Sequence, residues 1–346
     1  MNTSCPVMKS DNQLITLAHG SGGKQTHQLI QNIFLPAFSN DKLEMLHDGV
    51  LLDMPSSQIV FTTDSFVVQP LFFPGGDIGK LAVTGTLNDL AMCGAKPYYL
   101  SCGFIIEDGF SQNDLKMIVQ SMQKEAHANS VQIVTGDTKV IERQNGTNLF
   151  INTSGIGVCI GKDPINPTRI QKGDSIILSG DVGRHGMAIM AQRQGLEFSS
   201  PLLSDCCSLF PVVSSLIQKG IEIHCLRDLT RGGLATALVE LAEGSHMDFR
   251  IMEDAISVSE GVNSACEILG LDPFYVANEG RFVTFAPKHQ EEEVLKILRE
   301  FSEGQASSII GEVLEPSASP TVVAKNAFGT QRYLYRLSGD QLPRIC

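Results

Sequence analysis

The sequence lacks paired cysteines, long apolar runs and an excess of cations, and each absence excludes a class of protein. Nine cysteines are scattered along 346 residues without a single Cys-x-x-Cys pair. This odd, dispersed set argues against a disulfide framework or a structural zinc site. No apolar run approaches the ~20 residues that cross a bilayer, and the N-terminal MNTSCPVMKSDNQ has no signal-peptide core. We therefore expect a cytoplasmic protein in a reducing compartment, with no membrane association.

The charge balance narrows the possible ligands. The chain has 26 Lys and Arg against 38 Asp and Glu, a formal net charge of −12. This balance argues against nucleic-acid binding and against an anionic membrane surface. A nucleotide could still bind, if a metal ion, a lysine or backbone amides neutralised its phosphates locally. The hydrophobic fraction of 42% supports a substantial core.

Alternating strand and helix patterns predict an α/β (α+β) fold with two mixed-sheet domains. We predict four parts. Residues 1–40 hold an N-terminal arm, a Gly-rich loop and a helix, residues 41–165 a first α/β domain, residues 166–336 a second α/β domain, and residues 337–346 a mobile tail. Apolar runs predict strands at 58–63, 98–106, 131–135, 149–160, 175–179, 281–286, 308–313, 321–323 and 331–335. Periodic segments predict helices at 25–38, 77–93, 110–129, 186–194, 202–218, 231–243, 261–269 and 288–301, with Ser111 as an N-cap.

Three acidic residues follow apolar strands or occupy short polar breaks: Asp64, Asp89 and Asp137. The carboxyl ends of strands are where α/β sheets place ligands. Carboxylates, with Asn88 nearby, supply the hard oxygen ligands that Mg²⁺ prefers. Each aspartate alone is more simply a cap or a turn former. The three together favour a metal site.

A Gly-rich loop precedes the first predicted helix. It reads His19-Gly20-Ser21-Gly22-Gly23-Lys24 and offers backbone amides and a cation to a polyphosphate. It matches neither the Walker A pattern nor G-x-G-x-x-G, so a simple flexible turn is equally compatible with it. The full set expected to contact a nucleotide is His19, Gly20, Ser21, Gly22, Gly23, Lys24, Asp64, Asn88 and Thr138.

Lys139 and Glu279 are the candidate proton-transfer residues. Lys139 lies two residues after Asp137, so in a strand both side chains share one face. Glu279 occupies a polar break between apolar stretches, where a surface turn is the simpler interpretation. The segments 183–186 and 227–234 place cations at Gly-rich helix starts, which suits an anion as well as an ordinary helix entry.

The chain ends in Cys346, at the tip of the tail Asp340-Gln341-Leu342-Pro343-Arg344-Ile345-Cys346. Pro343 disfavours regular structure, and Gly339 offers a hinge. The seven steps from Gly339 to Cys346 can span ~25 Å. The thiol could therefore leave one site and enter another, although the tail alone would equally be a frayed terminus.

Taken together, these segments resemble the hydrogenase-maturation carbamoyl dehydratases (HypE type) of the superfamily that includes aminoimidazole ribonucleotide synthetase. The resemblance covers nearly the whole chain, and the central block with the terminal PRIC is the most specific part of it. It is carried by AHGSGGK (18–24), the block from TDSFVVQPLFF to AKP (63–97), GDTKV (136–140), TRGGL (230–234), GVNSACEILGLDP (261–273), ANEGR (277–281) and PRIC (343–346).

The resemblance implies a fold, a reaction and partners. The fold would be the PurM-like pair of α/β domains, and the protein a homodimer. A HypF-type carbamoyltransferase would load a carbamoyl group onto Cys346, and ATP with Mg²⁺ would drive its dehydration to a thiocyanate. A HypC–HypD type iron scaffold would accept the nitrile as a cyanide ligand for a [NiFe]-hydrogenase. The resemblance makes Cys346, Lys139 and Glu279 catalytic, with metal ligands Asp64, Asp89 and Asp137.

Two alternatives compete with this function. The first is an ATP-dependent small-molecule synthetase or kinase on the same fold, in which Cys346 has no role. The second is a nucleotide-binding assembly scaffold without catalysis. Two departures from the family pattern, Arg184 and Leu229, leave the roles of their loops open.

Overall fold

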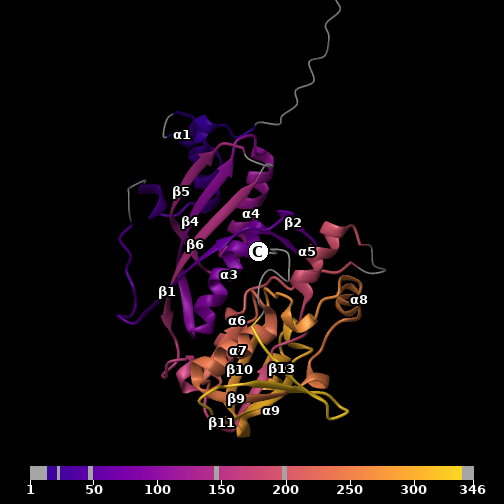
Figure 1. Cartoon of the computed structure of the whole chain (residues 1–346). Coiled ribbons are helices and arrows are strands. Elements are labelled where there is room, and N and C mark those ends of the chain that lie inside the picture. The colour runs from indigo at the N-terminus through magenta and orange to yellow at the C-terminus, as the bar shows by residue number, and fades with distance from the viewer. Residues whose placement is uncertain (1–13, 22–23, 46–49, 144–147, 197–200, 337–346) are drawn as a thin grey trace, which may run out of the picture.

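The computed structural model describes residues 14–21, 24–45, 50–143, 148–196 and 201–336. In these ranges one mixed sheet belongs to the first half of the chain and runs in the order β1-β6-β4-β5 (Figure 1). Its strands are β1 (Ile59–Phe66), β4 (Ala95–Glu107), β5 (Gln132–Ile141) and β6 (Leu149–Cys159). β4 and β5 pair in parallel, whereas β6 runs antiparallel to both β1 and β4.

A larger sheet belongs to the second half of the chain. Its order in the described residues is β13-β12-β9-β11-β7-β10-β8. Its strands are β7 (Asp174–Leu178), β8 (Cys225–Asp228), β9 (Met247–Met252), β10 (Phe282–Pro287), β11 (Ser308–Pro316), β12 (Val322–Lys325) and β13 (Gln331–Leu334). The predicted fold class, two mixed-sheet α/β domains, is confirmed. β8 and β9 were not predicted. β8 has only four residues, whereas β9 does alternate buried and exposed residues, a strand signal that the sequence carried.

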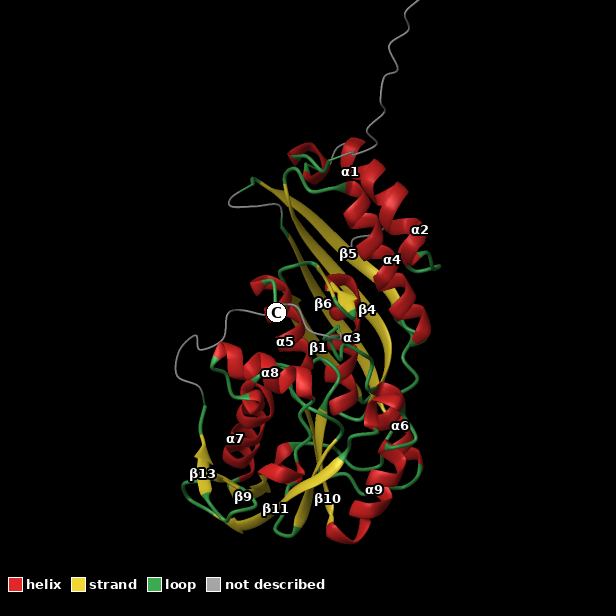
Figure 2. Cartoon of the chain, turned by 90° about the vertical axis from the view of Figure 1, so that its right-hand side faces the viewer, coloured by secondary structure: helices red, strands yellow, loops and turns green. Residues whose placement is uncertain are grey.

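Helices cover one face of the first sheet and pack between the two halves (Figure 2). The described helices are α1 (Lys24–Leu29), a π-turn (Ile30–Phe34), α2 (Leu35–Phe38), α3 (Ile78–Met92), α4 (Gln112–Ala128), α5 (Arg184–Gln194), α6 (Phe210–Gln218), α7 (Gly233–Ser245), α8 (Glu260–Leu269) and α9 (Glu291–Leu298). Among the described residues no helix is long and apolar enough to cross a membrane. A two-stranded ribbon, β2 (Phe72–Phe73) and β3 (Gly76–Asp77), precedes α3.

Local capping chemistry sets the start of two of these helices. The Asp77 carboxylate accepts the N–H groups of Gly79 and Lys80 at the start of α3. Ser111 accepts the N–H of Asp114 at the start of α4, which confirms its predicted role as an N-cap.

The prediction of one helix over residues 202–218 is wrong in its first half. Residues 202–209 are irregular, and α6 begins only at Phe210. The polar run Ser204-Asp205-Cys206-Cys207-Ser208 interrupts the apolar periodicity, and its backbone is held by groups from elsewhere in the chain.

Helix α3 is the element that joins the two halves. Leu81, Val83 and Leu87 belong to the core beneath the first sheet, whereas Ala91 and Met92 pack into a core formed with α6 and α9. Because α3 is buried on nearly all sides, it fixes the first sheet against the loops of the second half. The polar residues on this helix therefore lie at the junction of the two halves.

Candidate active site

Asn88 on α3 ties two loops of the second half to the first. Its amide nitrogen donates to the backbone oxygens of Cys207 (3.0 Å) and Glu279 (3.3 Å), and its oxygen accepts the N–H of Leu209 (2.8 Å). The side chain is buried and its polar atoms are occupied by these backbone groups. Asn88, predicted as a nucleotide ligand, therefore acts in this chain as a positioning residue for the loops.

The loop that carries Glu279 is fixed by a buried aspartate. The Asp205 carboxylate accepts the N–H of Glu279 (3.2 Å) and of Gly280 (2.9 Å). The next residue, Arg281, donates to the Asp181 carboxylate at 2.7 Å, so the loop is clamped on both sides. Such charge-assisted bonds between buried groups hold a backbone in one geometry.

Glu279 itself is buried beside α3. A Cβ added to Gly85 would lie 4.0 Å from its Oε2 atom, so the carboxylate lies against the small-residue face of the helix. The Cys206 thiol is close enough to the Glu279 carboxylate to interact with it electrostatically, and it lies 3.2 Å from the Thr84 hydroxyl. Burial, reinforced by the negative charge of Glu279, raises the pKa of Cys206 well above its ordinary value. This thiol therefore stays protonated at neutral pH.

A second group of carboxylates lies where β1, α3 and β8 meet. The Asp89 carboxylate on α3 accepts the Thr62 hydroxyl at 2.8 Å. Burial raises the pKa of both Asp64 and Asp89, and each of these carboxylates also raises the pKa of Asp228. Burial is the largest cause for Asp228, whose pKa rises to about 7. Three carboxylates thus repel one another in a partly dry site.

Two arginines compensate part of this negative charge. Arg227 lowers the pKa of Asp89 and Asp228, and Arg231 lowers that of Asp64 and Asp89. The mixture of carboxylates and guanidinium groups suits a phosphate that arrives with a divalent cation. Segment 227–234, predicted to bind an anion, therefore lies at the same junction as Asp64 and Asp89, which were predicted to bind a metal ion.

The site fits Mg²⁺ only in combination with phosphate oxygens. Within the described ranges, no three His, Cys, Asp or Glu side chains form a group able to hold a metal by themselves. Mg²⁺ commonly takes one or two carboxylates and completes its shell with water and substrate phosphates. Burial first, and neighbouring carboxylates second, raise the pKa of Asp89 and Asp228, and a bound cation would stabilise their charged forms.

Asp137 does not join this group within one chain, which corrects the predicted three-aspartate set. In the strand register Asp64 lies opposite Thr153, Thr153 lies opposite Cys102, and Cys102 lies opposite Gly136. Because residues opposite one another point to the same side of a sheet, these four share the helix-covered face. Asp137, one residue further along β5, lies on the opposite face. Asp64 and Asp137 also lie inside strands rather than after them, because the hydrogen bonds of a sheet join backbone groups and do not exclude a polar side chain.

Lys139 shares the open face with Asp137, as predicted from their spacing. Both side chains are exposed, whereas Val140 between Lys139 and Ile141 is buried. Glu279, by contrast, lies against α3 on the covered side of the sheet. The predicted Lys139–Glu279 pair is therefore not assembled within one chain.

The Gly-rich loop lies beside β5, next to Lys139. A Cβ on Gly20 would meet the backbone nitrogen of Val140 at 2.5 Å, so only glycine permits this approach. His19 accepts the N–H of Thr16 at 3.0 Å, Ser21 donates to Ala18, and Lys24 opens α1. Gly22, Gly23 and Cys346 lie outside the described residues.

A cavity of about 330 Å³ opens between α1, α2 and β5. Ile30, Phe34 and Phe104 are among its apolar lining, and Asp137 and Thr138 are among its polar residues. An apolar hollow with a few polar groups is the usual form of a small-ligand site. The cavity lies on the helix-covered side of the sheet, because Cys102 and Phe104 line it, so it shares the edge strand β5 with Lys139 but not its face. The cavity, the Gly-rich loop and Lys139 are gathered around this edge strand and form a second candidate region, separate from the junction.

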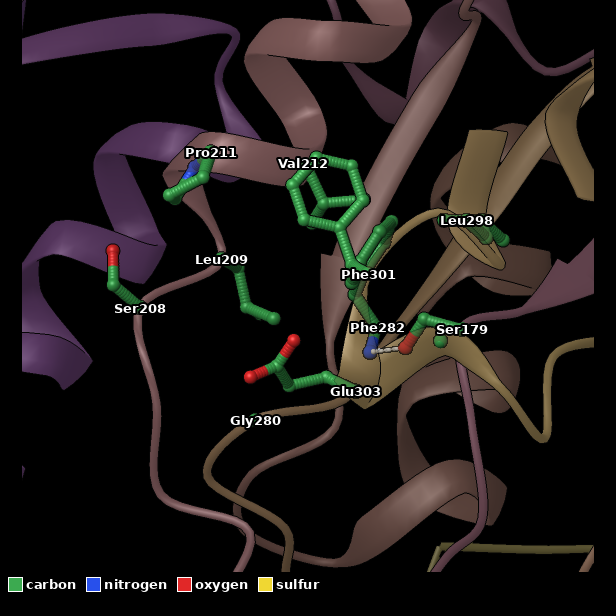
Figure 3. Close-up of a pocket in the computed structure, with 11 residues that line it drawn as sticks. Ser179, Ser208, Leu209, Pro211, Val212, Gly280, Phe282, Leu298, Phe301 and Glu303 are labelled. Carbon is green, nitrogen blue, oxygen red and sulfur yellow. Dashed lines mark hydrogen bonds between the residues drawn. The ribbon is translucent and has the colours of Figure 1, made fainter. Parts of the chain in front are cut away.

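Another cavity, of about 210 Å³, lies behind the junction between α6 and the loop after α9 (Figure 3). Leu209, Phe282 and Phe301 line it, and Ser179 is committed to the N–H of Phe282. Glu303 is its charged lining residue. None of the predicted site residues lines it, so its size does not make it the active site.

Two residues of the site, Asp228 and Asp205, were not predicted from the sequence. Asp228 was noted only as part of a cationic helix entry, and Asp205 lay in a segment predicted as helix. The one sequence signal for Asp205 was the polar run that breaks the helical period. Arg184 pairs with Asp181, and Leu229 is buried in the core, so these two departures are accommodated locally.

Comparison with known proteins places the chain in a family. Residues 46–159 match the AIR synthase related protein N-terminal domain, and residues 171–322 match the corresponding C-terminal domain. A carbamoyl dehydratase HypE of Bradyrhizobium diazoefficiens is 46% identical over 97% of both chains. A crystal structure of hydrogenase maturation protein HypE in complex with ATP is 45% identical, with a TM-score of 0.91, and covers 96% of this chain and 99% of its own.

A third relative was solved as a HypE–HypF complex. It is 43% identical, has a TM-score of 0.78, and covers 89% of this chain and 99% of its own. Similarity of this extent, in sequence and in structure, applies to both α/β domains. The chain belongs to the HypE family of hydrogenase maturation proteins.

Proposed function

We propose that the protein is a carbamoyl dehydratase that uses ATP to dehydrate a carbamoyl group carried on its own Cys346. The supporting observation is the junction of carboxylates and arginines at Asp64, Asp89 and Asp228, in a chain whose relatives are carbamoyl dehydratases. Phosphorylation of the amide oxygen makes it a leaving group. Its departure as phosphate, with removal of both amide protons, leaves S-cyanocysteine, ADP, phosphate and one proton. The transferred oxygen ends in the phosphate.

The chain's residues divide this work between binding and proton transfer. Arg227 and Arg231 would bind and orient phosphate oxygens, and carboxylates from the set Asp64, Asp89 and Asp228 would hold the accompanying cation together with those oxygens. The chemistry that Mg²⁺ supplies at such a site is charge screening and alignment of the γ-phosphoryl group. Glu279 and Lys139 accept the amide protons. Burial of Glu279 keeps bulk water away from its carboxylate.

Two separated regions suggest that a homodimer completes the site. The open face of the first sheet carries exposed apolar side chains, among them Ile59, Phe61 and Ile105. A two-fold axis parallel to the strands would stack these faces and place β5 of one copy over β1 of the other. Asp137 and Lys139 of one copy would then lie over β1 of its partner, the edge strand whose other face carries Asp64. An isologous pairing of this kind is the commonest oligomer.

A charge placed on this face is expected to split the dimer. Phe61, 65% exposed in the single chain, would be buried, so Phe61→Glu would leave an unpaired charge in the interface. Light scattering after size-exclusion chromatography should show a monomer, with ATP-dependent turnover reduced at least ~100-fold. The matched control Met117→Glu changes an exposed residue of α4, away from this face. A Phe61→Glu protein that stays dimeric would refute the proposed interface.

The partners follow from the chemistry at Cys346. A HypF-type carbamoyltransferase supplies the carbamoyl group, as suggested by the relative that was solved with HypF. A HypC–HypD type iron scaffold takes the cyano group, which becomes a cyanide ligand of a [NiFe]-hydrogenase. The thiol sits at the end of a ten-residue tail, residues 337–346, which gives it the reach to serve a donor, an internal site and an acceptor in turn.

The direct test is the mass of the C-terminal peptide. The thiol is carbamoylated with cyanate, and ATP and Mg²⁺ are added. We expect the peptide ending in Cys346 to lose one water, with no such change in Cys346→Ala. A carbamoyl group that persists while ATP is consumed would instead favour a small-molecule synthetase or kinase. No change in either the peptide or ATP would favour the assembly scaffold.

A further inference from the structure

The second sheet has one face that helices cover only in part. We call this its outer face and define it by one row of residues that the strand register places side by side: Tyr333, Val323, Arg250, Glu312 and Ser175. At one end of the row α9 covers the sheet, where the Ser175 hydroxyl donates to Glu291. At the other end β9, β12 and β13 carry side chains that remain exposed.

The exposed half of the outer face has the composition of a protein interface. Tyr333 is 55% exposed and Met252 is 37% exposed, and the Tyr335 ring lies 6.2 Å from that of Tyr333. Arg250 on β9 forms an ion pair with Glu312 on the neighbouring strand β11. Tyrosine, methionine and arginine are the residue types enriched where proteins bind one another. A surface selected only for solubility would not gather them on one edge of a sheet.

The same strands are held firmly from behind. Phe249, Ile251 and Leu334 alternate with the outer-face residues and are buried in the core of this domain. On the outer face itself, a groove of about 270 Å³ is bounded by Met252, Lys288 and Glu291. The face is therefore a preformed surface with a hollow, and binding to it costs little ordering of the chain.

The position of the outer face, close to the start of the tail that carries Cys346, indicates which kind of partner it binds. Tyr335 and Arg336 end the described residues, and Cys346 is ten residues further on. A tail of this length reaches at most ~35 Å from Arg336. The active site of any protein that modifies Cys346 must therefore lie within that distance, and the outer face, which includes Tyr333, lies at the base of the tail. In the dimer proposed above, the first sheet's open face serves self-association, which leaves the outer face for a different protein.

We propose that the outer face is the docking surface for the carbamoyltransferase that loads Cys346. The inference rests on the proposed function, because it assumes that Cys346 receives a carbamoyl group from another protein. Stable pairing with this partner, rather than with the acceptor of the nitrile, is favoured by the relative solved in complex with HypF. Tyr333 and Met252 supply the apolar contacts, and Arg250 and Glu312 supply the polar ones.

The test uses the full chain and its purified HypF-type carbamoyltransferase. The variants are Tyr333→Ser and Met252→Ser, with Met117→Ser as the control, since Met117 is 49% exposed on α4 in the other domain. Affinity is measured by titration calorimetry, and loading of Cys346 by mass spectrometry. We expect each outer-face variant to weaken binding at least ~10-fold and to slow loading accordingly, with the control unchanged.

A second measurement separates this proposal from the proposed function. Tail thiols are carbamoylated with cyanate, which needs no partner, and ATP-dependent dehydration is then followed. The variants should dehydrate the group as the unsubstituted chain does. If the unsubstituted chain fails here, the proposed function is wrong whatever the binding data show. Unchanged affinity in both outer-face variants overturns the docking proposal, as does a selective loss of self-association or of binding to the nitrile acceptor.

Discussion

Replacing Asp228 with asparagine is expected to remove ATP-dependent turnover while making the nucleotide-free and metal-free protein more stable. Asp228 is crowded by Asp64 and Asp89, and burial with these charges raises its pKa to about 7. Asparagine has the same shape without the charge. The site would lose a cation ligand, and we expect turnover to fall on the order of 100-fold or more.

The gain in stability should depend on pH with a definite sign. Between about pH 4 and 7 the folded protein keeps a proton on Asp228 that the unfolded chain has released. The free energy of unfolding of the unsubstituted chain therefore falls as pH rises through this window. A shift of this size corresponds to ~4 kcal/mol. Because Asp228 retains some exposed surface, screening should reduce the effect to about 1–2 kcal/mol.

Urea unfolding of the chelator-treated protein at pH 4.5 and pH 8 measures this effect. Asp228→Asn should match the unsubstituted chain at the lower pH and exceed its free energy of unfolding at the higher. Asp163→Asn, at an exposed position in the connector between the two halves, is the control and should change neither stability nor turnover. An Asp228→Asn protein that is fully active would show that this carboxylate takes no part in binding the cation.

Glu279→Gln is expected to stop the removal of protons from the carbamoyl group while sparing ATP binding. The backbone of Glu279 is fixed by Asp205 and by Asn88, so glutamine should keep the loop in place. A positioned general base contributes on the order of 10²–10⁴-fold to a rate. We expect dehydration of the cyanate-loaded tail to fall by a factor in this range.

The measurement for Glu279 pairs two readouts. Peptide mass spectrometry follows dehydration, and equilibrium binding of a non-hydrolysable ATP analogue should stay within ~3-fold of the unsubstituted chain if the defect is chemical. Glu303→Gln alters an exposed glutamate that lines the neighbouring cavity and provides the matched control. Dehydration at an unchanged rate in Glu279→Gln would assign the proton relay to other residues.

Much of the secondary structure could be predicted because it is set by local chemistry. The start of α3 follows from the Asp77 cap, and that of α4 from Ser111. Apolar runs marked the strands of both sheets, although β1 and β5 continue through Asp64 and Asp137. A polar residue ends an apolar run without ending a strand, because the hydrogen bonds of the sheet do not involve its side chain.

The membership of the site could not be read in the same way. Asp64 and Asp137 have similar sequence settings, yet the strand register places them on opposite faces of one sheet. Asp228 joins Asp64 and Asp89 only because α3 packs against β8. Asn88 resembled a ligand but holds two loops through backbone groups more than 100 residues away in sequence.

The sequence by itself determined the family and the two α/β domains, because these depend on motifs and on chain order. The tertiary structure decided which charges share a site. It assembled Asp64, Asp89 and Asp228 at the domain junction and kept Lys139 and Glu279 on opposite sides of a sheet. Sheet register and helix packing set these distances, and electrostatic coupling depends on distance rather than on sequence separation.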